Sequence, residues 1–155
     1  MLIDTHAHLD YDRFDDDRAE VIENAYQSGV KKIINIGADL ESSRKSVQLA
    51  KEYDFIYATV GMHPHHAEDF GPDSYAEFKE LAQAEEVVAI GEIGLDYHYD
   101  NSPRKKQQKV FKEQLKLAQE LELPVVIHSR DAKEDSLRIL KEYAADLEGV
   151  MHCYG

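Results

Sequence analysis

Short apolar runs alternate with longer amphipathic segments along the whole chain. The runs are rich in Val and Ile, end at Gly, Pro or Asp, and predict buried strands near residues 2–3, 32–36, 55–60, 87–90, 125–127 and 150–151. The intervening segments carry apolar residues at helical spacing and predict helices over residues 16–28, 41–53, 73–84, 103–122 and 132–147. Strands that alternate with helices in this way indicate a parallel sheet covered by helices.

Local signals mark the ends of two of these helices. Gly29 follows the first helix and is typical of the residue that ends a helix in a left-handed conformation. Ser102 and Pro103 precede the fourth helix and predict an N-cap followed by a proline in the first turn. One βα unit repeats roughly every 30 residues without a low-complexity linker, so we expect a single domain over residues 1–155.

Composition and charge narrow the functional classes. The 155 residues include 18 Lys and Arg against 31 Asp and Glu, which gives a net charge of −13 and argues against a protein that coats nucleic acid or membrane. A metal ion or a local basic patch can still hold a phosphate. A single cysteine forms no internal disulfide. Neither a signal peptide nor a membrane-length apolar run is visible, so the expected location is the cytoplasm.

The histidines gather where strands are predicted to end. All eight lie outside the predicted helices, and they follow five different strands: His6 and His8, then His63, His65 and His66, then His98, His128 and His152. The carboxyl ends of parallel strands share one edge of a sheet, where binding and catalysis collect. The sequence therefore predicts a site at this edge.

A metal site is the chemistry that these residues favour. His6 and His8 are two residues apart, so on a strand they face the same way and can hold one cation, although an isolated pair is as often a hydrogen-bonded structural feature. Asp4 would face the same way and could orient a ligand. The two oxygens of Glu92 can bridge two cations. Nitrogen and carboxylate ligands without a thiolate favour Zn²⁺, Mn²⁺, Fe or Ni over Ca²⁺.

Five motifs together resemble the TatD-type metal-dependent deoxyribonucleases, a branch of the amidohydrolase-like TIM-barrel hydrolases. They are Asp4-Thr5-His6-Ala7-His8, Gly61-Met62-His63-Pro64-His65, Gly91-Glu92-Ile93-Gly94-Leu95-Asp96-Tyr97, His128-Ser129-Arg130-Asp131-Ala132 and His152-Cys153-Tyr154-Gly155. The resemblance implies a parallel α/β TIM barrel with two divalent metal ions (Mg, Mn, Zn, Fe or Ni). It assigns His6 and His8 to the first ion and His128 and His152 to the second, with Glu92 bridging both.

The resemblance also implies a chain longer than these 155 residues. The sequence would form about six strands and five helices of a (β/α)8 barrel, which needs about 250 residues. Roughly 100 residues would be missing, including a Thr-Asp pair whose aspartate would be a further ligand and a candidate general base. A fragment, a truncated reading frame and a partial chain are all compatible with this. Open barrel edges predict self-association.

The predicted activity is divalent-metal-dependent hydrolysis of DNA, because two cations can activate a water and neutralise charge on a phosphodiester. Glu92 is the expected catalytic residue. Arg130 can bind phosphate through its guanidinium or pair with a neighbouring carboxylate such as Asp131. His63 and His65 can contact phosphate or donate a proton.

Tyr97, with its neighbours His98 and Tyr99, can stack on a base or remain an exposed loop aromatic. Two other classes stay open. One is another metallohydrolase, namely a phosphoesterase, a lactonase or a deacylase. The other is a truncated domain that binds metal without turnover.

Overall fold

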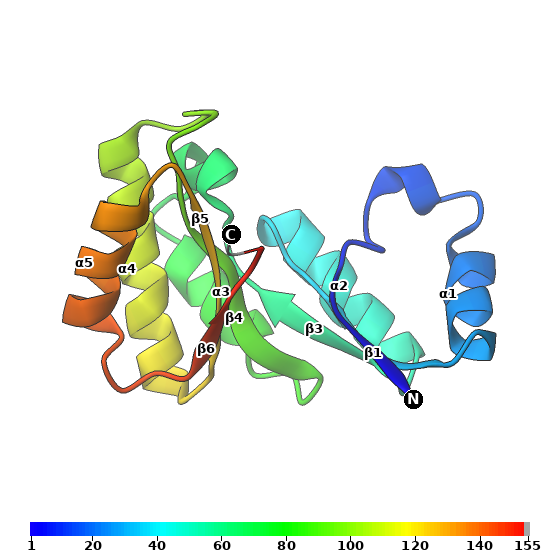
Figure 1. Cartoon of the computed structure of the whole chain (residues 1–155). Helices are drawn as coiled ribbons and strands as arrows, with labels where there is room; N and C mark the ends of the chain where they lie inside the picture. The colour runs from blue at the N-terminus through cyan, green and yellow to red at the C-terminus, as the bar shows by residue number, and fades with distance from the viewer. Residues whose placement is uncertain (154–155) are drawn as a thin grey trace.

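The computed structural model describes residues 1–153 and contains one six-stranded parallel sheet in the order β1-β2-β3-β4-β5-β6. The strands are β1 (Leu2–Ala7), β2 (Val30–Asn35), β3 (Ile56–Val60), β4 (Val87–Asp96), β5 (Val125–Arg130) and β6 (Gly149–Met151). The sheet curls into an open half barrel with helices on its outer side (Figure 1). The predicted incomplete TIM barrel is therefore confirmed. Tyr154 and Gly155, which end the last sequence motif, lie outside the described residues.

The α-helices fall where the periodicity predicted them. They are α1 (Arg18–Gln27), α2 (Leu40–Glu52), α3 (Ser74–Leu81), α4 (Arg104–Leu121) and α5 (Lys133–Tyr143). Gly29 follows α1 with φ at 101°, as its position after the helix predicted. The prediction for Ser102 is wrong, since α4 has no side-chain cap and the Ser102 hydroxyl instead donates to the His65 carbonyl at 3.0 Å.

Two short 3-10 helices were not predicted, η1 (Asp12–Phe14) and η2 (Pro64–Asp69). The second places His65 and His66 in a helical turn, which the sequence pattern did not indicate. Pro64 supplies the fixed φ that favours a first helical turn, and the His63 side chain accepts a hydrogen bond from the backbone N–H of His65. This turn holds His63 above the sheet edge.

Strands β1, β4 and β5 extend further than their apolar runs. The sequence predicted the fourth strand only to residue 90, but β4 continues to Asp96 and is almost entirely buried. Glu92 is therefore a strand residue with 4% exposure rather than a residue after the strand. His6 and His128 likewise lie within β1 and β5. Consequently these three site residues lie within the sheet and not in the loops that follow it.

The apolar core lies between the sheet and the helices, and it includes the predicted α4 face of Val110, Phe111, Leu115 and Ala118. The prediction of buried strands is wrong at the two edges. Leu2 and Ile3 of β1 are 60% and 50% exposed, and Val150 of β6 is 56% exposed. Among the described strands each edge strand pairs on one side only, which explains this exposure. No helix of the described residues is long and apolar enough to cross a membrane.

Candidate metal centre

One open cavity at the carboxyl edge of the sheet brings the predicted ligands together. Its lining includes His6, His8, Glu92, His128 and His152. These residues come from β1 and the residue that follows it, from β4 and β5, and from the residue after β6. Parallel pairing puts these strand ends at one edge, and the curl of the sheet brings together side chains that are up to 146 positions apart in the sequence.

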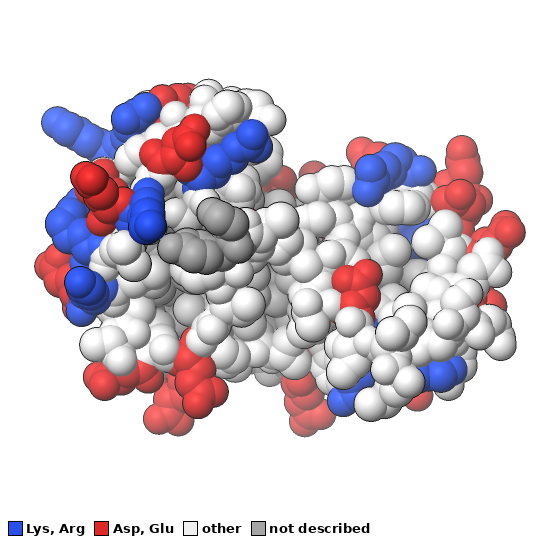
Figure 2. Space-filling model, in the orientation of Figure 1, with Lys and Arg blue, Asp and Glu red and all other residues white. Residues whose placement is uncertain are grey.

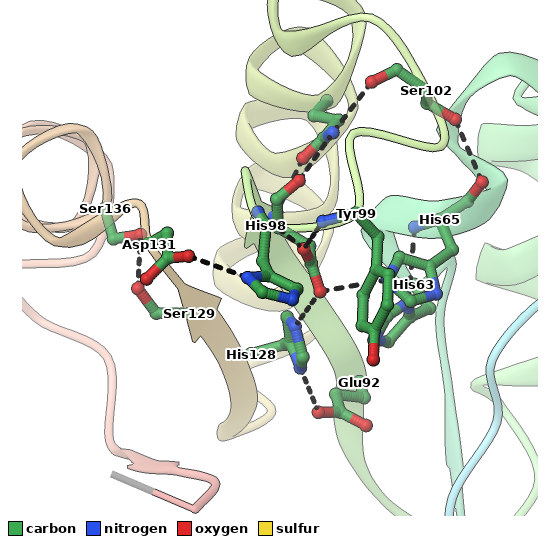
Figure 3. A network of polar contacts seen from close by, with 12 residues as sticks. His63, His65, Glu92, His98, Tyr99, Ser102, His128, Ser129, Asp131 and Ser136 are labelled. Carbon is green, nitrogen blue, oxygen red and sulfur yellow. Dashed lines mark hydrogen bonds and ion pairs between the residues drawn. The ribbon is translucent and has the colours of Figure 1, made fainter. Parts of the chain in front are cut away.

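Glu92 lies between histidines of two different strands. Its Oε2 is 3.2 Å from His6 Nε2, and its Oε1 is 3.0 Å from His128 Nδ1. Figure 3 shows the contact between His128 and Glu92. Burial alone would raise the pKa of Glu92, but the neighbouring rings of His128 and His6 hold that pKa well below its usual range. Glu92 is therefore a buried carboxylate whose two oxygens face different partners.

The donor atoms around Glu92 fit a cation. His8 Nδ1 is 3.2 Å from the carbonyl of Ile36, which can only accept, so the neutral ring carries its proton there and leaves Nε2 with a lone pair. His6 Nε2 is buried, and although it lies 3.2 Å from Glu92 Oε2, no contact among the described residues gives it a well-aligned hydrogen bond. One ligand atom each from His6, His8 and Glu92 lies within 4.8 Å of the others. A divalent cation would satisfy this orphaned nitrogen.

His63 belongs to a second group that shares Glu92, together with His128. Burial and the neighbouring His128 lower the pKa of His63 to about 3, so the ring is neutral at ordinary pH. Its Nδ1 accepts the N–H of His65 at 3.2 Å, which leaves the ring proton on Nε2. His63 thus presents a hydrogen-bond donor beside Glu92, while His128 offers the nitrogen that faces the carboxylate.

His152 lies beside the first group rather than beside His128. Its ring stacks on His6 at a centroid distance of 3.5 Å, and it belongs to neither of the groups that share Glu92. Burial and His6 lower the pKa of His152. His152 therefore lines the cavity as a neutral imidazole.

Asp96 is the residue of this region that sequence reasoning gave no role. It is fully buried and contacts the rings of His65 and His128 at 2.9 and 3.0 Å. The signal that could have found it is its place two strand periods after Glu92 in the same motif. Asp4, which was expected to orient a ligand, instead accepts the backbone N–H of His6 at 3.0 Å. The expectation for Asp4 is wrong because its side chain turns back onto its own strand.

Two glycines let β4 and β5 approach closely. Gly94 pairs with His128 in the parallel register, has φ at 144°, and has no room for a Cβ because the His128 carbonyl occupies that space. A Cβ on Gly91 would lie 2.6 Å from Cβ of Val126. The glycines of the motif therefore allow the 3.0 Å contact between Glu92 and His128.

The predicted substrate residues occupy the rim. Arg130 is exposed, lines the cavity, and lies over the ring of Tyr99 at 4.9 Å from its centroid. It forms no ion pair within residues 1–153, so the pairing with Asp131 that competed with phosphate binding is not seen. Tyr97 also lines the cavity, whereas His65 does not and points its Nε2 at Asp96.

Charges of both signs are interspersed on the face drawn in Figure 2, with several Lys and Arg side chains over the end formed by α4 and α5. Arg104, Arg130 and Lys133 line the cavity at this end. Asp131, Glu134 and Asp135 line the same end of the cavity, so its rim carries charges of both signs and is not a basic patch.

Comparisons with known proteins agree on one family. The family described as "TatD related DNase" matches residues 3–155. The chain is 48% identical over 155 residues to the "Uncharacterized metal-dependent hydrolase YabD" of Bacillus subtilis and covers 61% of that protein. It is 41% identical over 144 residues to the "3'-5' ssDNA/RNA exonuclease TatD" of a Rahnella strain and covers 55% of it.

A solved structure gives the same result. YjjV, a TatD homologue from Escherichia coli, superposes with a TM-score of 0.92 at 35% identity, over 99% of this chain and 60% of YjjV. The chain therefore spans about three fifths of the length of the relatives that it matches.

Proposed function

Since the chain belongs to the TatD-related DNase family, we propose that it carries most of the metal ligands of a divalent-metal-dependent nuclease. This nuclease would remove nucleotides from single-stranded DNA. The observation that carries the proposal is the position of Glu92, whose two oxygens face His6 and His128. A carboxylate placed in this way can join two cations. The names of the relatives as metal-dependent hydrolase and ssDNA/RNA exonuclease support the reaction class.

The ligand residues can be assigned to two cations by their positions around Glu92. His6, His8 and one oxygen of Glu92 would hold the first cation, and the other oxygen of Glu92, with His128, would hold the second. His152 stacks on His6, so it would join the second cation only if its ring moved away from His6. Bound divalent cations would lower the pKa of a water and neutralise charge on a phosphate oxygen. Because Glu92 is buried within β4, its carboxylate would be held in place between the two groups of histidines.

The remaining residues position the substrate. His63 can donate its Nε2–H to a phosphate oxygen, because the ring is neutral and its Nδ1 is occupied by the His65 N–H. Arg130 can bind phosphate through two N–H groups. Tyr97 offers an aromatic ring on the same rim. The ring of His65 packs edge to face against the ring of His63.

A nuclease assay tests this proposal. We expect single-stranded DNA labelled at its 5′ end to shorten stepwise in the presence of Mn²⁺ or Mg²⁺ and to remain intact in excess chelator. Glu92→Gln should reduce turnover at least about 100-fold, because the neutral amide is a poor bridging ligand. Glu77→Gln is the matched control, since Glu77 is a partly exposed carboxylate on α3 that pairs with Arg44.

Other results of these assays would favour a different function for the protein. Hydrolysis of a lactone or an N-acyl substrate without any cleavage of DNA would favour another metallohydrolase. Metal binding without turnover of any of these substrates would favour a metal-binding domain. Full cleavage of DNA in excess chelator would contradict the metal mechanism itself.

A further inference from the structure

The backbone of β4 departs from regular strand pairing where it carries Glu92. Pairing with β3 runs as far as Val60 and Ile90, and pairing with β5 passes from Ile90 directly to Ile93. The peptide group that joins Gly91 to Glu92 therefore lies outside both ladders. Buried backbone N–H and C=O groups need hydrogen-bond partners, so this peptide group must find them elsewhere.

Thr59 of β3 supplies one of these partners. Its hydroxyl donates to the Gly91 carbonyl at 2.5 Å and accepts the backbone N–H of Gly37 at 3.2 Å. The Gly37 carbonyl in turn accepts the N–H of Glu92 at 2.9 Å. Both polar atoms of the peptide group before Glu92 are thus tied to Thr59, one directly and one through Gly37.

This small network is closed to solvent. Thr59 is 0% exposed and Glu92 is 4% exposed. Loss of the hydroxyl would leave the Gly91 carbonyl as a buried acceptor without its donor, which is costly. The peptide group would then turn toward another donor, and the Cα of Glu92 would move with it.

The position of the Glu92 carboxylate depends on this anchor. Its Oε2 lies 3.2 Å from His6 Nε2, and its Oε1 lies 3.0 Å from His128 Nδ1. We propose that Thr59 is a positioning residue, whose hydroxyl fixes the peptide group before Glu92 and thereby holds the carboxylate between these two histidines. The inference rests on the proposed metal-dependent function. It names a residue that does not line the cavity and acts only through the shared ligand.

Two substitutions at this position separate the hydrogen bond from packing. Thr59→Val removes the hydroxyl and keeps the branched shape, so it leaves no room for a water in place of the hydroxyl. Thr59→Ser keeps the hydroxyl and loses only the methyl group. Ser74→Ala is the matched control, because Ser74 is also a buried hydroxyl that bonds a glycine, accepting the Gly71 N–H at 2.9 Å on α3.

The test reads the position of Glu92 and the affinity for metal separately. In metal-free crystals of Thr59→Val, we expect the carboxylate of Glu92 to move away from His6 Nε2 and His128 Nδ1. Calorimetric titration of this variant with Zn²⁺ should show at least about 10-fold weaker binding than the wild type. Thr59→Ser and Ser74→Ala should keep both contacts and bind Zn²⁺ like the wild type, even where their unfolding shows a loss of stability.

A Thr59→Val protein in which Glu92 keeps both contacts, and which binds Zn²⁺ as tightly as Ser74→Ala, overturns the proposal. If Thr59→Val does not fold, Thr59→Ser still decides. Wild-type affinity with the serine hydroxyl on the Gly91 carbonyl supports the proposal, whereas weaker binding with that hydrogen bond in place overturns it. A wild type that binds no Zn²⁺ would count against the metal-dependent function alone, because the crystal structures are determined without metal.

Discussion

Replacement of Gly94 by alanine should destabilise the protein and separate His128 from Glu92. Gly94 has φ at 144°, in a region that L residues rarely adopt, and a Cβ at this position would collide with the carbonyl of His128 on β5. Both obstacles are backbone features of the central sheet, so no side chain can rotate away to relieve them. The strands would have to move apart.

Substitutions at two other glycines separate the contributions of backbone strain and overpacking to the loss of stability. Gly29 has φ at 101° but open space where a Cβ would lie, so Gly29→Ala measures backbone strain alone, about 1–2 kcal/mol. Gly71 has open space and no such φ, so Gly71→Ala should stay within about 0.5 kcal/mol of the wild type or be slightly stabilising. Gly94→Ala adds overpacking to strain, and we expect a loss of about 3–5 kcal/mol.

Urea unfolding of the three variants, followed by circular dichroism, gives the comparison. If Gly94→Ala folds, its affinity for Zn²⁺ should fall as well, whereas Gly29→Ala and Gly71→Ala should bind Zn²⁺ like the wild type. A Gly94→Ala protein that loses no more stability than Gly29→Ala would refute the reasoning, because it would show that β4 and β5 can separate at little cost.

Further predictions concern the site and the sheet edges. Glu92→Ala should reduce turnover far more than Arg130→Ala in steady-state kinetics, since one holds both cations and the other only positions substrate; equal losses would argue against a bridging Glu92. Burial lowers the pKa of His63 to about 3, so below pH about 6.5 this ring takes up a proton in the unfolded chain but not in the folded one, and the fold loses up to about 5 kcal/mol of stability as pH falls toward 3. In denaturant titrations His63→Asn should flatten that part of the pH profile, and an unchanged profile would contradict the assignment. Saturating Mn²⁺ should raise Tm and a chelator should reverse the rise, whereas a Tm that ignores Mn²⁺ would count against a folded metal site. Exposed apolar residues on the edge strands predict concentration-dependent association in light scattering, which Ile3→Lys should weaken; a wild type that is monomeric at every concentration would show this prediction to be wrong.

The sequence pattern was sufficient for the order and type of the main elements. Continuous Val and Ile runs and helical spacing are local signals, and so is the glycine after α1, which has φ at 101°. The parallel topology placed His6, Glu92 and His128 at the same edge of the sheet. Their convergence also needs the curl of the sheet, which brings β1 close to β4 although two strands lie between them.

What the sequence did not predict depends on contacts between distant segments. The exposure of Leu2 reflects which strands lie beside β1, and no local pattern contains that information. Asp96 contacts His65 of η2 and His128 of β5 at once, and no pattern in the sequence indicated that these three residues lie together. Ser102 looked like a helix cap because its neighbour is proline, yet its hydroxyl bonds the His65 carbonyl.

Anomalous scattering from crystals of the protein soaked in Mn²⁺ would show whether Glu92 joins two cations. We expect two peaks about 3.5–4 Å apart, one beside His6, His8 and Oε2 of Glu92, and one beside Oε1 of Glu92 and Nδ1 of His128. A single peak, or two peaks of which neither contacts Glu92, would contradict the claim that this carboxylate joins two cations.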